Sequence, residues 1–137
     1  MTCRACGEPC VYFEIPEPYL EYTERLQTGE TVQSVGAICT RCLSVRVESG
    51  REPPQQPDFA RISAAFPTDP AQAVPFALAV GLCSSLAMNR EEIVALCSAV
   101  ERAGGDPLLV LERLACDETL EPAVSIARRR HQLEQLL

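Results

Sequence analysis

The residues best suited to chemistry in this chain are cysteines, because four of its eight cysteines form two C-x-x-C pairs. Cys3 and Cys6 belong to "CRACG", and Cys39 and Cys42 belong to "CTRCL". A C-x-x-C pair in a tight turn can direct two sulfurs at one ion, and two such pairs supply the four thiolates of a closed tetrahedral zinc site. The spacing therefore predicts one structural Zn²⁺ bound by Cys3, Cys6, Cys39 and Cys42.

Strand-like segments flank both pairs and predict a zinc ribbon over residues 1–50. "VYFEI" (11–15) alternates apolar and polar residues, which is the period of a half-buried strand. "VGAI" (35–38) and "LSVRV" (43–47) enclose the second pair, so we expect a hairpin with its two cysteines at the tip.

The stretch between the two pairs is longer than a zinc ribbon needs. It contains 32 residues, whereas paired C-x-x-C motifs are commonly about 15–20 residues apart. We therefore expect a helical insert over "PEPYLEYTERL" (16–26), after which "TGETVQS" (28–34) returns the chain to the hairpin.

Other interpretations of the same cysteines stay open on the sequence. A rubredoxin-like iron site also uses two C-x-x-C pairs, although Leu43 stands where that family has glycine and the chain has no tryptophan. Thioredoxin-type redox chemistry needs one C-x-x-C that opens a helix in a βαβ unit, a context that neither pair has. Cys10 is an alternative ligand to Cys6, but the glycine directly after Cys6 favours Cys6, and we expect Cys10 to begin a strand.

Beyond the ribbon the sequence predicts helices. "REPPQQP" (51–57) contains three prolines and almost nothing apolar, which is typical of a linker. No strand pattern follows in residues 58–137. The predicted fold is therefore α+β, with a zinc ribbon (1–50), a linker (51–57) and a helical domain (58–137).

Four helices are predicted in the helical domain, over about 70–88, 90–103, 107–116 and 122–137. The first has almost no polar face and should be central to the core. Asn89 with Glu92 predicts a capping box before the second, and the Gly-Gly pair at 104–105 should end it. The inward-facing residues of the last helix are predicted to be Val124, Ala127, Leu133, Leu136 and Leu137.

Few residues of the helical domain suggest catalysis. Cys83, Cys97 and Cys116 lie on apolar helix faces, so we expect them in the core. His131 is the sole histidine, and no Ser-His-Asp or Cys-His constellation is evident. The sequence therefore predicts a protein that is not an enzyme.

Charge disfavours binding to nucleic acid. All twelve basic residues are arginine, and nineteen acidic residues bring the net charge to −7, whereas phosphate backbones attract clustered positive charge. Arg128, Arg129 and Arg130 with His131 form the one basic cluster, but consecutive helical residues are about 100° apart and fan out. We expect this cluster to contact acidic protein surface, on a partner or on the chain itself. The helix pair 90–103 and 107–116 resembles a helix-turn-helix in spacing only, because its second helix would offer leucines to the major groove.

Membrane insertion is also disfavoured. The longest apolar stretch (73–88) has 16 residues, short of the ~20 needed to span a bilayer. The N-terminus shows no signal-peptide pattern, so we expect a cytoplasmic protein.

Three segments carry a family resemblance: "CRACGEPC", "AICTRCLSV" and the tail "NREEIVALCSAVERAGGDPLLVLERLACD…RRRHQLEQLL". Together they resemble small uncharacterised zinc-ribbon proteins of haloarchaea over nearly the whole chain. The resemblance implies a ribbon followed by helices and an acidic surface, and it implies no activity. The predicted function is a zinc-containing interaction protein with a protein partner. The alternatives are a nucleic-acid-binding zinc-ribbon protein of transcription or translation and an iron or thiol redox protein.

Overall fold

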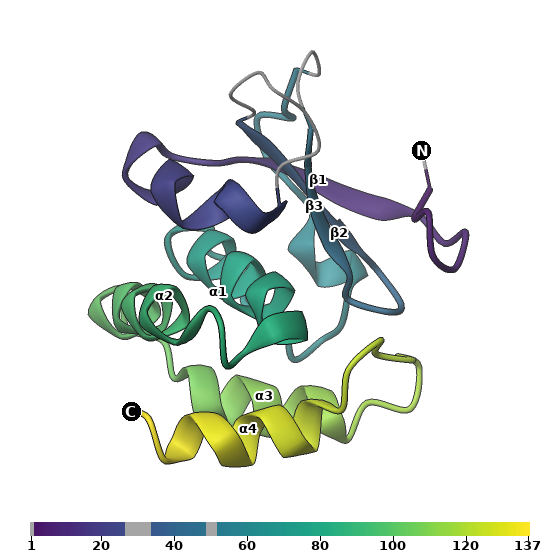
Figure 1. Cartoon of the computed structure of the whole chain (residues 1–137). Helices are drawn as coiled ribbons and strands as arrows, with labels where there is room; N and C mark the ends of the chain where they lie inside the picture. Colours follow the sequence, from purple (N-terminus) through teal and green to yellow (C-terminus); the bar gives the residue numbers. More distant parts are fainter. Residues whose placement is uncertain (1, 27–33, 49–51) are drawn as a thin grey trace.

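The computed structural model describes residues 2–26, 34–48 and 52–137 and confirms the predicted α+β fold (Figure 1). A three-stranded antiparallel sheet forms first, from β1 (Cys10–Glu14), β2 (Val35–Cys39) and β3 (Val45–Glu48) in the order β1-β2-β3. Helices follow, and residues 58–137 contain no strand. These are α1 (Pro70–Leu82), α2 (Arg90–Arg102), α3 (Pro107–Ala115) and α4 (Ile126–Glu134), with short 3₁₀ turns η2 (Phe59–Arg61) and η3 (Cys83–Ser85).

The sheet has the burial pattern that its sequence predicts. In β1 and the residue after it, Val11, Phe13 and Ile15 are buried, whereas Tyr12 is half-buried and Glu14 is exposed. The central strand β2 is buried along its whole length. It carries Gly36 because the ring of Phe13 lies directly on the backbone there, and a Cβ would stand 2.5 Å from a ring carbon.

The predicted helical insert is a 3₁₀ helix, η1 (Glu17–Leu26). Thr23 is fully buried, and its hydroxyl donates a hydrogen bond of 2.7 Å to the carbonyl of Leu20. Except for Ser34, the predicted return segment 28–34 lies outside the described residues.

Helix α1 lies between the sheet and α2 and forms the centre of the core (Figure 1). Its ten residues from Ala73 to Leu82 are all buried, as expected for the helix without a polar face. Asp69 caps its start by accepting a hydrogen bond from the Ala71 N–H, so Pro75 lies inside the helix. Near its other end, Gly81 touches β3, because a Cβ there would stand 2.6 Å from the Cβ of Val45.

One hydrophobic core spans the sheet and the helices. All four phenylalanines of the chain are in sequential ring contact, with centroids of Phe13 and Phe59 5.8 Å apart, Phe59 and Phe66 5.8 Å, and Phe66 and Phe76 5.3 Å. These rings connect β1 through η2 to α1. The division of the chain into a ribbon domain and a helical domain stays a prediction.

The predicted capping box at Asn89 is wrong. Asn89 is 2% exposed, and its Nδ2 donates a hydrogen bond of 3.1 Å to the carbonyl of Leu82 at the end of α1. Its φ of −117° and ψ of 23° lie outside the extended region of a typical N-cap, and its side chain makes no capping bond to α2. Asn89 therefore secures the end of α1, which stops at Leu82 and not near 88.

The last helix also begins later than predicted. It starts at Ile126, because Ser125 accepts a hydrogen bond of 3.3 Å from the Arg128 N–H. Leu133 is buried and Val124 and Leu136 are half-buried as expected, but Ala127 and Leu137 are exposed. Of the three helical cysteines, Cys83 and Cys97 are buried, whereas Cys116 at the end of α3 is exposed, contrary to prediction. None of the described helices has the length and apolar character needed to cross a bilayer.

Replacement of Leu82 by aspartate tests the central place of α1. Leu82 is 1% exposed, so Leu82→Asp would bury an unpaired carboxylate and should lower the free energy of unfolding by at least about 4 kcal/mol. Leu109→Asp is the matched control, because Leu109 is 39% exposed and the change there should cost less than about 1 kcal/mol. Equal urea midpoints for the two variants would contradict the described packing.

Candidate metal centre

The four cysteines of the two C-x-x-C pairs come together at one end of the sheet. Their sulfurs all lie within 4.8 Å of one another, with 3.6 Å between the Sγ atoms of Cys3 and Cys42 and 3.4 Å between those of Cys6 and Cys39. Tetrahedral Zn–S bonds of about 2.3 Å place sulfurs about 3.8 Å apart, whereas a disulfide needs about 2.05 Å. The spacing fits four thiolates around one ion, and all eight cysteines are free.

Strand pairing brings the two pairs together. Cys10, the first residue of β1, lies opposite Cys39, the last residue of β2. Because the strands are antiparallel, the turn before β1 and the turn after β2 meet at the same end of the sheet. Thr40 holds them there, since its backbone N–H and its hydroxyl both donate to the carbonyl of Pro9, at 3.0 and 2.8 Å.

Backbone N–H groups point at the first sulfur of each pair. The Ala5 N–H donates to the Sγ of Cys3 at 3.4 Å. In the second pair, the N–H groups of Arg41 and Cys42 both donate to the Sγ of Cys39 at 3.4 Å. Such bonds favour a thiolate over a thiol, so in each turn they stabilise negative charge on the first sulfur against the opposing effect of burial.

Both turns end in a left-handed residue. Gly7 has a φ of +80°, as its place after the first pair predicts, and Leu43 after the second pair has a φ of +62°. The left-handed region costs a leucine about 1–2 kcal/mol. Leu43 is 3% exposed, and burial of a leucine side chain stabilises by about 1.5–3 kcal/mol, which offsets that strain. Leucine is therefore tolerated in the left-handed conformation that this turn requires.

When no metal is bound, the first cysteines of the two pairs, Cys3 and Cys39, differ in the direction of their pKa shifts. Burial opposes ionisation of Cys3, but hydrogen bonds from the backbone of Cys6 and Ala5 outweigh it and lower the pKa of Cys3 to about 7. At Cys39 burial dominates and raises the pKa of the thiol. Metal binding must therefore displace protons, and affinity should fall as pH falls.

Cys10 lies beside the cluster and is not part of it. Among the described residues, the four clustered cysteines are the one set of three or more metal-ligating side chains close enough to share an ion. Burial raises the pKa of the Cys10 thiol, although the guanidinium of Arg46 lies 3.8 Å from its sulfur. Cys10 begins β1 as predicted.

Arg41 is a structural link that no local pattern in the sequence indicates. Its guanidinium contacts Glu8 next to the first turn at 3.3 Å and Glu121 in the α3–α4 connection at 2.8 Å. Two backbone hydrogen bonds of 2.9 Å join the same segments. The Glu121 N–H donates to the Arg41 carbonyl, and the Ala123 N–H donates to the Cys42 carbonyl. The cysteine turns are thereby joined to residues 80 positions away.

The basic cluster of α4 is partly engaged with the chain itself. The guanidinium of Arg130 lies 3.8 Å from Glu112 and 3.7 Å from Glu134. Arg129 donates a hydrogen bond of 2.9 Å to Gln132, and Arg128 is exposed. The expected contact with the chain's own glutamates is present for Arg130.

The fold and the cluster together define an α+β protein with a four-cysteine candidate metal centre. A family model described as "Family of unknown function (DUF6276)" matches residues 2–137. The chain belongs to this family. No curated protein and no solved structure matches it.

Three cysteine-to-serine substitutions distinguish ligands from neighbours. Cys39→Ser removes one of four sulfurs and should abolish stoichiometric metal binding, together with the stabilisation on the order of 10 kcal/mol that such a metal can supply. Cys10→Ser should keep one metal ion per chain. Elemental analysis and thermal unfolding of the reconstituted variants measure both effects. Loss of metal from Cys10→Ser with retention in Cys6→Ser would show that Cys10, and not Cys6, is the ligand.

Proposed function

We propose that Cys3, Cys6, Cys39 and Cys42 bind one structural Zn²⁺ and that the protein is a non-enzymatic interaction protein. The observation that supports this most directly is the closed set of four sulfurs within 4.8 Å. Four thiolates complete a tetrahedral shell, so the ion has no open position at which to activate water. Its contribution is then to hold the two turns together.

Zinc is the metal proposed over iron, and the two are separable by experiment. A tetrahedral set of four sulfurs accepts either metal, but Zn²⁺ has no d–d absorption or redox chemistry, whereas ferric thiolate sites are coloured. The protein purified without added metal should contain one zinc per chain and be colourless. Substitution by Co²⁺ should give the visible bands of a tetrahedral thiolate site. Stoichiometric iron with a red colour would contradict the zinc proposal and would indicate an iron redox protein.

The first cysteine turn is the surface proposed for a partner. Arg4, Ala5 and Gly7 are exposed, and this turn projects from the end of the sheet in Figure 1. A bound metal would fix its shape, which reduces the entropy lost when a partner binds. The net charge of −7 supports a protein partner over nucleic acid. We infer a cytoplasmic setting at high salt from the acidic, lysine-free composition and the resemblance to haloarchaeal proteins.

Affinity capture from native extract at multimolar salt tests this surface. Arg4→Glu reverses one exposed charge on the turn without removing a ligand, and Arg90→Glu does the same at the exposed start of α2. A protein captured by the parent and by Arg90→Glu but lost with Arg4→Glu is the expected result.

Direct titration tests the nucleic-acid alternative. Anisotropy titrations with single- and double-stranded DNA and RNA at low and multimolar salt should show no micromolar binding. Micromolar binding that weakens when Arg128, Arg129 and Arg130 become alanine would identify nucleic acid, and not a protein, as the partner.

A further inference from the structure

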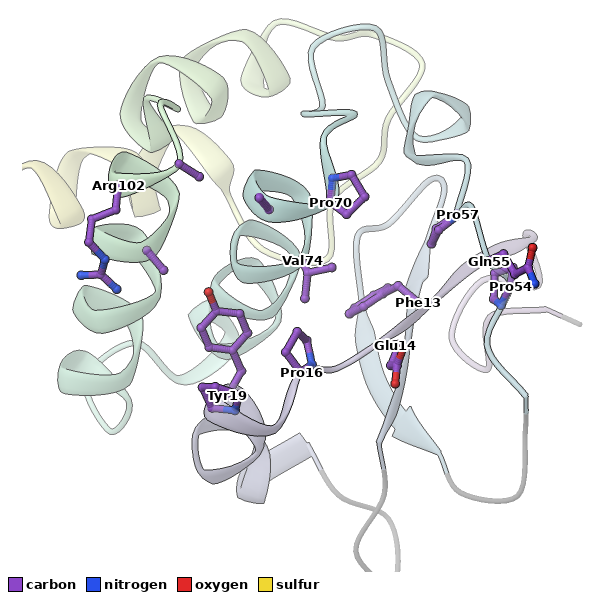
Figure 2. Close-up of a pocket in the computed structure, with 14 residues that line it drawn as sticks. Phe13, Glu14, Pro16, Tyr19, Pro54, Gln55, Pro57, Pro70, Val74 and Arg102 are labelled. Atoms are coloured by element: carbon purple, nitrogen blue, oxygen red, sulfur yellow. The ribbon is translucent and has the colours of Figure 1, made fainter.

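A groove of about 600 Å³ lies away from the cysteine turns, where five segments meet (Figure 2). The end of β1, η1, the linker, the start of α1 and the end of α2 all contribute to it. Phe13, Val74 and Ala99 are its buried apolar residues. Five prolines also line it: Pro16, Pro18, Pro54, Pro57 and Pro70.

The prolines make the groove rigid and poor in hydrogen-bond donors. A proline ring fixes φ and removes the backbone N–H, so this lining loses little conformational entropy when a ligand binds. An extended peptide would leave carbonyl groups unpaired against such a wall, which is costly. A hydrocarbon body needs no such partners, and the volume is in the range of small-molecule sites, about 300–1,000 Å³.

Polar groups lie on opposite sides of the groove. Figure 2 shows Arg102 and Tyr19 on one side and Glu14, Pro54 and Gln55 on the other. Among the described residues, the Arg102 guanidinium and the Tyr19 hydroxyl have no hydrogen-bond or ion-pair partner. Two donors therefore point to a ligand that carries one anionic group, while Glu14 opposes a second negative charge.

Two carbonyl groups at the end of α2 have other hydrogen-bond partners and do not compete for the Arg102 guanidinium. Helix C-termini leave carbonyl groups that attract arginine side chains. Here the Ala103 carbonyl accepts a hydrogen bond of 3.0 Å from Gln72 Nε2, and the Val100 carbonyl accepts one of 2.9 Å from the Gly105 N–H. Arg102 is left available to an external carboxylate.

We propose that this groove binds a small amphipathic monocarboxylate. The apolar body lies along the prolines and Val74, and the carboxylate accepts hydrogen bonds from Arg102 and Tyr19. This site goes beyond the proposed function, because it needs neither the metal nor a protein partner.

Octanoate is the probe, and calorimetric titration of the full chain is the measurement. Saturable binding of one octanoate per chain is expected, with 1-octanol binding more weakly because it lacks the charge. Arg102→Gln should weaken octanoate binding about tenfold, the effect of losing a charge-assisted hydrogen bond. Arg90→Gln is the matched control on the same helix and should leave affinity unchanged.

A second pair of variants tests the groove itself. Ala71 lines the groove and is exposed, so Ala71→Phe should fill the space and abolish binding without unfolding the chain. Ala127→Phe makes the same change at an exposed position on α4, outside the residues that line the groove, and should bind like the parent. Absence of saturable binding by the parent, or equal affinity for Arg102→Gln and Arg90→Gln, would overturn the proposal, as would equal affinity for the two phenylalanine variants.

Discussion

The pairing of β1 with β2 is the constraint on which the candidate metal centre depends. With Cys10 opposite Cys39, the two cysteine turns meet at one end of the sheet. A shift of one residue would turn Val11 and Phe13 toward solvent and Tyr12 toward the core. The apolar face of β1 therefore fixes the register, and the register fixes the distances between sulfurs. The metal centre is in this sense a consequence of core packing and not only of the C-x-x-C motifs.

The core that fixes this register is completed by helix α1. Three strands of four or five residues are too few for an independently stable sheet unless something covers one face. Gly81 permits the close approach of α1 to β3, and Phe59 and Phe66 fill the space between β1 and α1. A metal bound at the sheet end and a helix packed on the sheet face thus stabilise the same short strands from two directions.

Local periodicity accounts for what could be predicted from the sequence. The alternation in 11–15, the apolar helix after Asp69 and the glycine stop at 104–105 each depend on neighbours a few residues apart, and each is present in the structure. The errors concern residues whose partners are distant or whose backbone is unusual. Asn89 bonds to the carbonyl of Leu82, and its φ and ψ do not suit a cap. Residues 121 and 123 bond to the second cysteine turn, and α4 begins only after this connection, at Ile126.

The candidate groove also cannot be predicted from local sequence patterns. Its lining comes from five segments, and the linker prolines indicate only an absence of regular structure when read alone. Arg102 reads as an ordinary surface residue of an amphipathic helix. Only the assembled fold places it on the same side of an apolar groove as Tyr19.

The bonds from residues 121 and 123 to the second cysteine turn bear on the order in which the chain folds. Closing a flexible loop of 80 residues costs about 4 kcal/mol of chain entropy from its length alone. Two backbone hydrogen bonds do not recover this cost unless the cysteine turn is formed and the intervening helices are already packed on the sheet. During synthesis the residues before 43 emerge long before residue 121, so the turn has time to form first. We therefore expect the connection between α3 and α4 to be added as a late step, onto a surface that the N-terminal third of the chain has already formed.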